Sequence, residues 1–241
     1  MNNTFYRLVI RLVDAFLWGG ELIGEENLPE RGPAVFIANH LDALGPIGIF
    51  CSIPKRMHTW AVGDMMNKER VVDYLNKDFT ERQLHLRPPL SLWFSKALSR
   101  LTLPLYQSMG CIPVWRNNYD SMHETLKLSI EVLRQEKILL IFPEDNLLPA
   151  DPLTRMNPFL RAFVRLGEEF YADTGQRLAF YPIAVHPRRI VQVGEPVLHN
   201  PLAHQGEERH RMKDIMETTI RKMYLQLSGT DISRSLTVER K

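Results

Sequence analysis

The chain has 241 residues, a formal net charge of +2, and a composition that is 44% hydrophobic and 24% charged. This composition is typical of a globular protein, and the small net charge without a basic stripe argues against a nucleic-acid partner. Cys51 and Cys111 are the only cysteines. They make neither a disulfide framework nor a C-x-x-C metal site, so the simplest interpretation is a reducing compartment.

The first segment, residues 4–23, predicts an amphipathic helix with a wide apolar stripe. Arg7, Arg11 and Asp14 interrupt its apolar run, which argues against a signal peptide and against a spanning helix. Periodicity alone favours a helix packed on the domain, and a helix lying in the membrane interface is the alternative. We therefore divide the chain into this helix (1–24), one domain (25–228) and a polar tail (229–241).

Short apolar runs of strand length follow, each bounded by proline, glycine or polar residues. They alternate with stretches of helical periodicity, one of which opens with the capping box Ser121-x-x-Glu124. This alternation predicts an α/β fold with a mixed, largely parallel central sheet flanked by helices. The predicted strands are 34–38, 57–62, 111–115, 138–142 and 178–185, and the predicted helices are 121–135, 158–172 and 206–227.

The leucine-rich part of residues 66–110 has no single interpretation. It contains Trp93 and Phe94 but is interrupted by Lys96 and Arg100. It fits a helical lid, a second segment that faces a membrane, or a buried helix of a large domain.

Asn39 and His40 come directly after the buried run 34–38, at a strand end, where ligand sites of α/β sheets gather. An imidazole at such a position can act as a general base near neutral pH. Asp42 is the nearest carboxylate in the sequence. The other seven histidines show no ligand spacing, so we expect no metal site.

Two further groups of polar residues follow predicted strands. The run 138–142 ends in Phe142-Pro143-Glu144, and Arg116 follows the run 111–115. Arginine suits bidentate phosphate binding, although an arginine after a strand is also common on plain surfaces. Glu144 has an equally plain alternative as a capping or salt-bridging residue.

The order of these blocks resembles the 1-acylglycerol-3-phosphate acyltransferase family of glycerolipid acyltransferases. The blocks are Asn39-His40, the Gly-x-Ile-x-Val-x-Arg strand that ends at Arg116, Phe142-Pro143-Glu144, and the Pro-Ile-Ala-Val and Val-Gly-Glu-Pro-Val strands. The resemblance covers roughly residues 20–200. It implies that His40 takes the proton of an acceptor hydroxyl, which then attacks the thioester of acyl-CoA or acyl carrier protein.

The resemblance also implies a site, partners and a location. No metal, cofactor or covalent intermediate is needed, and no Gly-x-Ser-x-Gly elbow is present. We expect acyl-CoA or acyl carrier protein, a lysolipid acceptor and a membrane surface as partners, at the cytoplasmic face of the membrane. The expected catalytic residues are His40 and Asp42, and the expected substrate-binding residues are Asn39, Arg116, Phe142, Pro143, Glu144, Asn146 and Arg161.

The sequence departs from the family pattern in the first block. The acid that orients the family's histidine falls at Gly45, so Asp42 or Glu144 must replace it if the base is to work. In serine proteases, loss of the orienting acid costs about 10⁴ in rate.

The block after Glu144 departs as well. The family continues Phe-Pro-Glu with Gly-Thr-Arg-Ser, where this chain has Asp145 for the glycine and Leu147 for the arginine. Both changes disfavour a dianionic phosphate. Arg155 or Arg161 could compensate, but a less anionic acceptor fits better.

Three alternatives remain open at this stage. The chain could be a catalytically degenerate acyltransferase fold that binds lipid or acyl carrier without transfer. It could be a hydrolase in which His40 activates water. It could also be a plain α/β domain in which His40 and Glu144 are satisfied loop residues.

Overall fold

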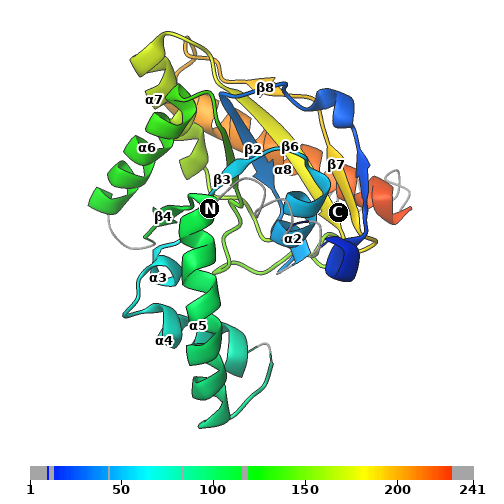
Figure 1. The fold of residues 1–241 in the computed structure, drawn as a ribbon. Helices are drawn as coiled ribbons and strands as arrows, with labels where there is room; N and C mark the ends of the chain where they lie inside the picture. Colours follow the sequence, from blue (N-terminus) through cyan, green and yellow to red (C-terminus); the bar gives the residue numbers. More distant parts are fainter. Residues whose placement is uncertain (1–9, 11–13, 43, 83, 116–118, 230–241) are drawn as a thin grey trace. The chain divides into compact units, whose positions relative to one another are not determined.

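The structure is a computed structural model that describes residues 10, 14–42, 44–82, 84–115 and 119–229 (Figure 1). Its contacts divide the chain into two compact units. Unit 1 comprises residues 57–129, and unit 2 comprises residues 2–56 and 130–241. The segment predicted as one domain, 25–228, thus contributes to both units.

Unit 2 is built on a mixed sheet in which β1, β7, β6, β2 and β5 are neighbours in that order. The pairs β1–β7, β6–β2 and β2–β5 are parallel, and β6 is antiparallel to β7 and to the short β8. This arrangement confirms the predicted fold class. The strands are β1 Glu21–Ile23, β2 Ala34–Ala38, β5 Ile138–Ile141, β6 Ala179–His186, β7 Ile190–Val193 and β8 Val197–Leu198.

Strands β2 and β5 lie in the interior, and every residue of both is buried. A strand buried on both faces carries a continuous apolar run, which is the pattern found at 34–38 and 138–141. The predicted strands 34–38, 138–142 and 178–185 are therefore confirmed to within one residue at each end.

Helices pack on this sheet (Figure 1). Both α2 and α8 contact β6, and Figure 1 shows α2 in front of the sheet and α8 behind it. Gly175 and Gly229 end α7 and α8 in the left-handed conformation that glycine adopts without strain. The helical segments of unit 2 are η1 Asp14–Trp18, η2 Glu25–Asn27, α2 Leu44–Ser52, η4 Ala162–Val164, α7 Arg165–Thr174 and α8 Gln205–Ser228.

The first half of the helix predicted over residues 4–23 lies mostly outside the described residues, and the predicted end of this helix is wrong. Residues 14–18 form a π-helical turn, and 21–23 form β1, which pairs with β7. Gly19 turns the chain with a φ of 55°. The indole of Trp18 is 1% exposed and donates a 2.8 Å hydrogen bond to Ser52 Oγ, so this residue lies in the core of unit 2.

Unit 1 contains the parallel strands β3 Met57–Val62 and β4 Ile112–Val114, which confirm the predicted runs 57–62 and 111–115. Helix α6 begins at Tyr119, two residues before Ser121, so the predicted capping box is wrong. Ser121 Oγ instead donates to Trp115 O. The helical segments are α3 Gly63–Met66, α4 Val71–Tyr74, η3 Leu75–Glu81, α5 Leu90–Met109 and α6 Tyr119–Arg134, whose last residues belong to unit 2.

Within the described ranges, no helix combines the length and the apolar composition that crossing a membrane requires.

Candidate functional site

The loop that follows β2 carries Asn39 and His40 at the carboxyl end of that strand. Asn39 is completely buried, and its side chain pairs with the backbone of Val185 in β6. Nδ2 of Asn39 donates to the Val185 carbonyl at 2.9 Å, and Oδ1 accepts from the Val185 N–H at 2.7 Å. The amide thus takes the place of one more strand residue beside β6. This pairing fixes the point at which the chain leaves the sheet, and therefore the position of the His40 backbone.

A second contact fixes His40 from the other side of β2. Its backbone N–H donates a 2.7 Å hydrogen bond to Oε1 of Glu144. The other carboxylate oxygen, Oε2, accepts from the backbone N–H of Asn157 at 2.8 Å. Glu144 is 9% exposed and follows β5, the parallel neighbour of β2. The glutamate of Phe-Pro-Glu therefore joins the His40 loop to the segment around residue 157.

Burial and hydrogen bonding act in opposite directions on the Glu144 carboxyl. Burial raises its pKa above the ordinary value, and the negative charge of Asp42 adds to that rise. The His40 and Asn157 N–H groups and the charge of Arg221 favour the carboxylate and lower the pKa. The net direction is upward because desolvation is the largest effect.

The imidazole of His40 is exposed and lies against the ring of Phe142. The two ring centroids are 5.0 Å apart, and the planes meet at 69°, an edge-to-face arrangement. Phe142 is half-buried, so its ring supports one side of the imidazole while another side faces solvent. An imidazole that is both supported and accessible has the exposure that a general base requires.

The turn after His40 is tight. Leu41 and Asp42 both have positive φ angles, 41° and 51°, which non-glycine residues seldom adopt. Asp42 is exposed, and Leu44 N donates to Leu41 O as α2 begins. Gly45, where the resemblance places an aspartate, lies against the backbone of His40. A Cβ at this position would be 1.8 Å from the His40 carbonyl oxygen. In this backbone, position 45 has no room for a carboxylate.

The segment after Glu144 folds back on itself. Asp145 Oδ1 accepts from Leu147 N at 3.1 Å, which makes an Asx turn, and Leu160 N donates to Pro143 O at 2.7 Å. Asn146 and Leu147 are exposed at this turn, and Leu147 is 89% exposed. The aspartate that replaces the family's glycine therefore has a local structural role.

The same chain reversal brings the backbone of Arg161 close to Phe-Pro-Glu, because Arg161 directly follows Leu160, whose N–H binds Pro143 O. Arg161 is exposed, and its Nη1 lies 3.0 Å from Nε2 of His210 in α8. The predicted helix 158–172 begins late for the same reason. Phe159 forms an antiparallel bridge with Glu144, and helical structure starts only at Ala162.

Two residues of α8, Glu217 and Arg221, hold the 154–159 segment. No pattern in the sequence pointed to either of them. Glu217 Oε2 accepts from Phe159 N at 3.0 Å. Arg221 donates to Thr154 Oγ1 at 2.7 Å and to the carbonyls of Met156 and Asn157 at 3.2 Å. These contacts fix the N–H of Asn157 that binds Glu144, so α8 supports the His40 loop through two intermediates.

The predicted site residues thus divide into three groups. Asn39, His40, Phe142, Pro143 and Glu144 are brought together at the ends of β2 and β5. Asp42, Asn146 and Arg161 lie on the adjoining turns and are exposed. Arg116 lies outside the described residues. Among the residues that the structure describes, no group of three or more histidine, cysteine or acidic side chains could hold a metal ion.

Comparisons with known proteins support the fold. No family model and no curated protein matches the chain. Among solved structures, the chain is similar to the 1-acyl-sn-glycerophosphate (LPA) acyltransferase PlsC from Thermotoga maritima. The TM-score is 0.52 at 14% identity, and the match covers 95% of this chain and 84% of the other. At this identity the likeness shows a shared fold.

Proposed function

We propose that this protein is an acyltransferase of phospholipid metabolism, peripheral to the cytoplasmic face of the membrane. It moves a fatty acyl group from acyl-CoA or acyl carrier protein to the hydroxyl of a lysophospholipid or a related acceptor. The observation that carries the proposal is the His40 loop, because the Val185 backbone holds Asn39 and the Glu144 carboxylate holds the His40 N–H. The fold shared with an acyltransferase supports the same reaction class.

In the proposed reaction, the exposed imidazole of His40 accepts the proton of the acceptor hydroxyl. The hydroxyl oxygen forms an ester bond with the acyl carbonyl carbon while the thioester C–S bond breaks. The released thiolate takes up a proton, which returns His40 to its neutral form. Asp42 is the candidate for orienting the ring, and the edge-to-face contact with Phe142 limits the ring's movement. Asn39 and Glu144 act on the backbone of the loop, so they position the base without touching the reacting atoms.

The acceptor in this proposal carries less negative charge than a phosphate monoester. Leu147 stands where the family has an arginine, and the Asp145 carboxylate lies in the same turn. Arg161 follows the chain reversal next to this turn, and its Nη1 lies 3.0 Å from Nε2 of His210. A lysolipid with a zwitterionic headgroup, or an alcohol, suits this turn.

The test uses purified protein, acyl-CoA or acyl carrier protein as donor, and a panel of lysolipids and alcohols. We expect acceptor-dependent release of thiol, and a loss of about 10²–10⁴ in rate for His40→Ala. The control is His123→Ala, which changes an exposed histidine of α6. Unchanged turnover in His40→Ala would remove this residue from the mechanism. Free fatty acid released without any acceptor would indicate the hydrolase alternative.

One observation favours a second candidate, a degenerate fold that binds lipid or acyl carrier without transfer. The crowding of Gly45 against His40 O leaves no place for the acid that the family uses. Native mass spectrometry distinguishes the two candidates. Bound lipid together with no thioester consumption across donors and acceptors would favour the degenerate fold, and acceptor-dependent turnover would exclude it.

A further inference from the structure

The first turns of α5 in unit 1 have an inverted distribution of polar and apolar side chains. Ser91 and Ser95 are completely buried, whereas Leu90, Trp93 and Phe94 are 55%, 70% and 38% exposed. A helix of a water-soluble domain normally shows the opposite distribution. This inversion means that the apolar face of α5 is turned away from its own unit.

The buried hydroxyls have defined partners, so the helix is held in this orientation. The Thr80 hydroxyl lies 3.0 Å from Ser95 Oγ and donates to Asn76 O at 3.0 Å. Ser95 also donates to Ser91 O at 2.8 Å. Helix η3, which carries Thr80, packs against α5. Of these contacts, the one between Thr80 and Ser95 joins the two helices, so rotating α5 to bury Trp93 would break it and take the buried hydroxyls apart.

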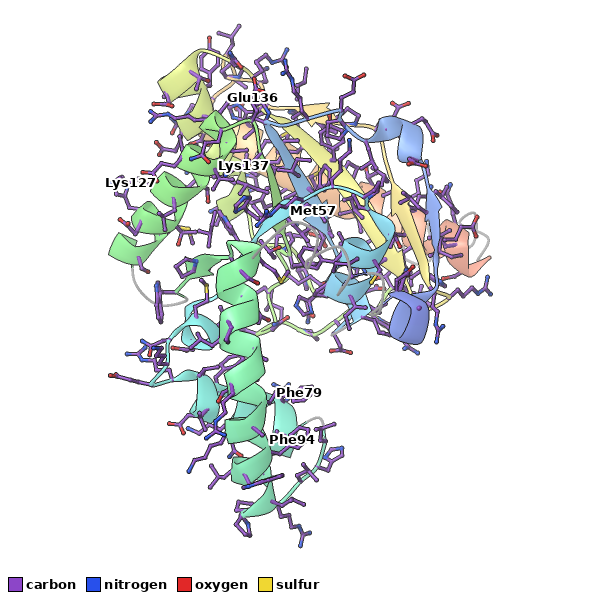
Figure 2. All side chains as sticks on the ribbon, in the orientation of Figure 1. Met57, Phe79, Phe94, Lys127, Glu136 and Lys137 are labelled. Carbon is purple, nitrogen blue, oxygen red and sulfur yellow. The ribbon has the colours of Figure 1, made fainter. Side chains whose placement is uncertain are left out.

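The exposed apolar side chains gather at one end of unit 1. Figure 2 shows Phe94 on the lower part of α5, near the loop that precedes the helix. Single exposed apolar residues are ordinary, but a contiguous group marks an interaction site. We define this α5 surface by Leu84, Leu90, Leu92, Trp93 and Phe94, which are all at least 38% exposed.

The chain segment that carries the α5 surface has charges of one sign. From residue 82 to residue 115 the sequence has four arginine or lysine residues and no aspartate or glutamate. Arg87, Lys96 and Arg100 are exposed. Basic residues beside aromatic and leucine side chains match the two parts of an anionic bilayer, the headgroups and the acyl chains. A second copy of the same surface would instead bring like charges together.

The shape of this region also suits a bilayer better than a peptide. The nearby hollow, about 380 Å³ in volume, is lined by Glu81, His85, Leu86, Arg87 and Pro88. None of the five side chains of the α5 surface lines it. These side chains protrude from a loop and a helix start, and tryptophan in particular favours the membrane interface.

We propose that the α5 surface is a docking site for an anionic lipid bilayer, in which Leu92 and Trp93 enter the interface while Arg87 and Lys96 face anionic headgroups. This inference does not depend on the proposed acyl transfer, since a binding-only protein would use the surface equally. Docking would place unit 1 at the source of lipid substrates, if the protein is the proposed enzyme.

The test measures co-sedimentation of the full chain with phosphatidylcholine vesicles, with and without one third phosphatidylglycerol. We expect tighter binding to the anionic vesicles, and binding about tenfold weaker for the double variant Leu92→Ser/Trp93→Ala. Arg87→Glu should weaken binding to the anionic vesicles by about fivefold or more. The matched control is Leu202→Ser, which changes a leucine that is 89% exposed in unit 2, and it should bind like the wild type. All of these residues are exposed, and circular dichroism checks folding.

A second readout locates the contact. Tryptophan emission should shift to the blue when anionic vesicles are added, and Trp93→Phe should remove most of this shift while retaining binding. Wild-type binding by Leu92→Ser/Trp93→Ala would overturn the proposal, and so would an equal shift in Trp93→Phe. A protein that binds neither kind of vesicle would overturn the proposal. If light scattering also shows a protein complex that is absent in the double variant, the surface binds a protein partner instead.

Discussion

The backbone N–H of His40 and the carboxylate of Glu144 are joined by a 2.7 Å hydrogen bond between the ends of β2 and β5. The glutamate of Phe-Pro-Glu thus acts on the backbone of the candidate base. Its second oxygen holds Asn157, so both acceptor oxygens of the side chain are used within the protein.

This arrangement predicts that Glu144→Gln will lose stability and activity together. Glutamine keeps one acceptor oxygen but turns an NH₂ group toward one of the two N–H donors, which leaves a buried donor without a partner. We expect a loss of about 1–3 kcal/mol in the free energy of unfolding, measured by urea denaturation, and a fall in kcat. Glu26→Gln, an exposed control, should change neither. A stable but inactive Glu144→Gln would instead indicate direct contact with substrate.

The pairing of Asn39 with Val185 predicts a specific requirement for an amide. Asn39→Asp replaces the donor with a carboxylate oxygen that faces the Val185 carbonyl at about the same place. We expect a loss of about 1–3 kcal/mol, larger if the carboxylate stays charged. Asn67→Asp is the matched control, because among the described residues Asn67 uses its side-chain oxygen as the acceptor for Glu69 N, and an aspartate keeps that acceptor. Equal stability of the two variants in urea would contradict the role assigned to Asn39.

The close packing of Gly45 predicts that placing an aspartate at this position will not increase acyl transfer. In Gly45→Asp the new Cβ overlaps the His40 carbonyl oxygen, so the loop must move. We expect a loss of about 2 kcal/mol or more and a fall in turnover. Gly206→Ala is the control, since its Cβ would meet only His204 atoms at 3.5 Å. A gain in turnover for Gly45→Asp would show that the loop tolerates a different path.

Glu217 predicts a stability contribution that depends on pH. Burial raises the pKa of its carboxyl, but hydrogen bonds from Lys213, Phe159 N–H and Arg221 outweigh burial and lower the pKa below its ordinary value of 4.5. A lowered folded-state pKa adds stability that is present above 4.5 and is lost as pH falls through the folded value.

The measurement compares Glu217→Gln with the wild type by urea unfolding from neutral pH to below 4.5. At neutral pH the wild type should be more stable by about 1–3 kcal/mol, and the difference should shrink in acid. A difference that stays constant with pH would show that the charge of Glu217 does not matter. The variant should also lower kcat at neutral pH, because Phe159 lies in the segment that holds Glu144.

Replacing Leu147 by arginine should change which acceptor the protein prefers. Its side chain is 89% exposed, so Leu147→Arg should alter the free energy of unfolding by less than about 0.5 kcal/mol. An arginine here should favour phosphate-bearing lysolipids by about tenfold in kcat/KM, the value of one charge-assisted hydrogen bond. Competition between a phosphate monoester and a zwitterionic lysolipid measures the ratio. An unchanged ratio would indicate that the turn does not face the headgroup.

The sequence predicted the interior of the fold better than its connections. The strands 34–38 and 138–141 carry uninterrupted apolar runs because they are buried on both faces, and such runs are visible without a structure. The predicted capping box is wrong because Ser121 lies inside α6, where its hydroxyl donates to the Trp115 carbonyl. The helix start predicted at residue 158 is wrong because Phe159 instead forms an antiparallel β-bridge with Glu144.

The sequence pointed to the residues of the candidate site but not to their contacts. Asn39, His40 and Glu144 were found from strand ends and block order. Their partners are Val185, Asn157, Glu217 and Arg221, and no periodicity connects these distant residues to the motifs. The steric role of Gly45 could not be read either, because it depends on the position of one carbonyl oxygen.

The contact between Trp18 and α2 has a practical consequence. A Cβ on Gly48 of α2 would lie 2.6 Å from the Trp18 indole, so the ring and the helix pack too closely for even one added methyl group. Variants shortened at the start of the chain should therefore keep Trp18, because its loss would leave a cavity beneath α2, the helix that follows the His40 loop. A purification tag is better attached beyond Gly229, where α8 has already ended.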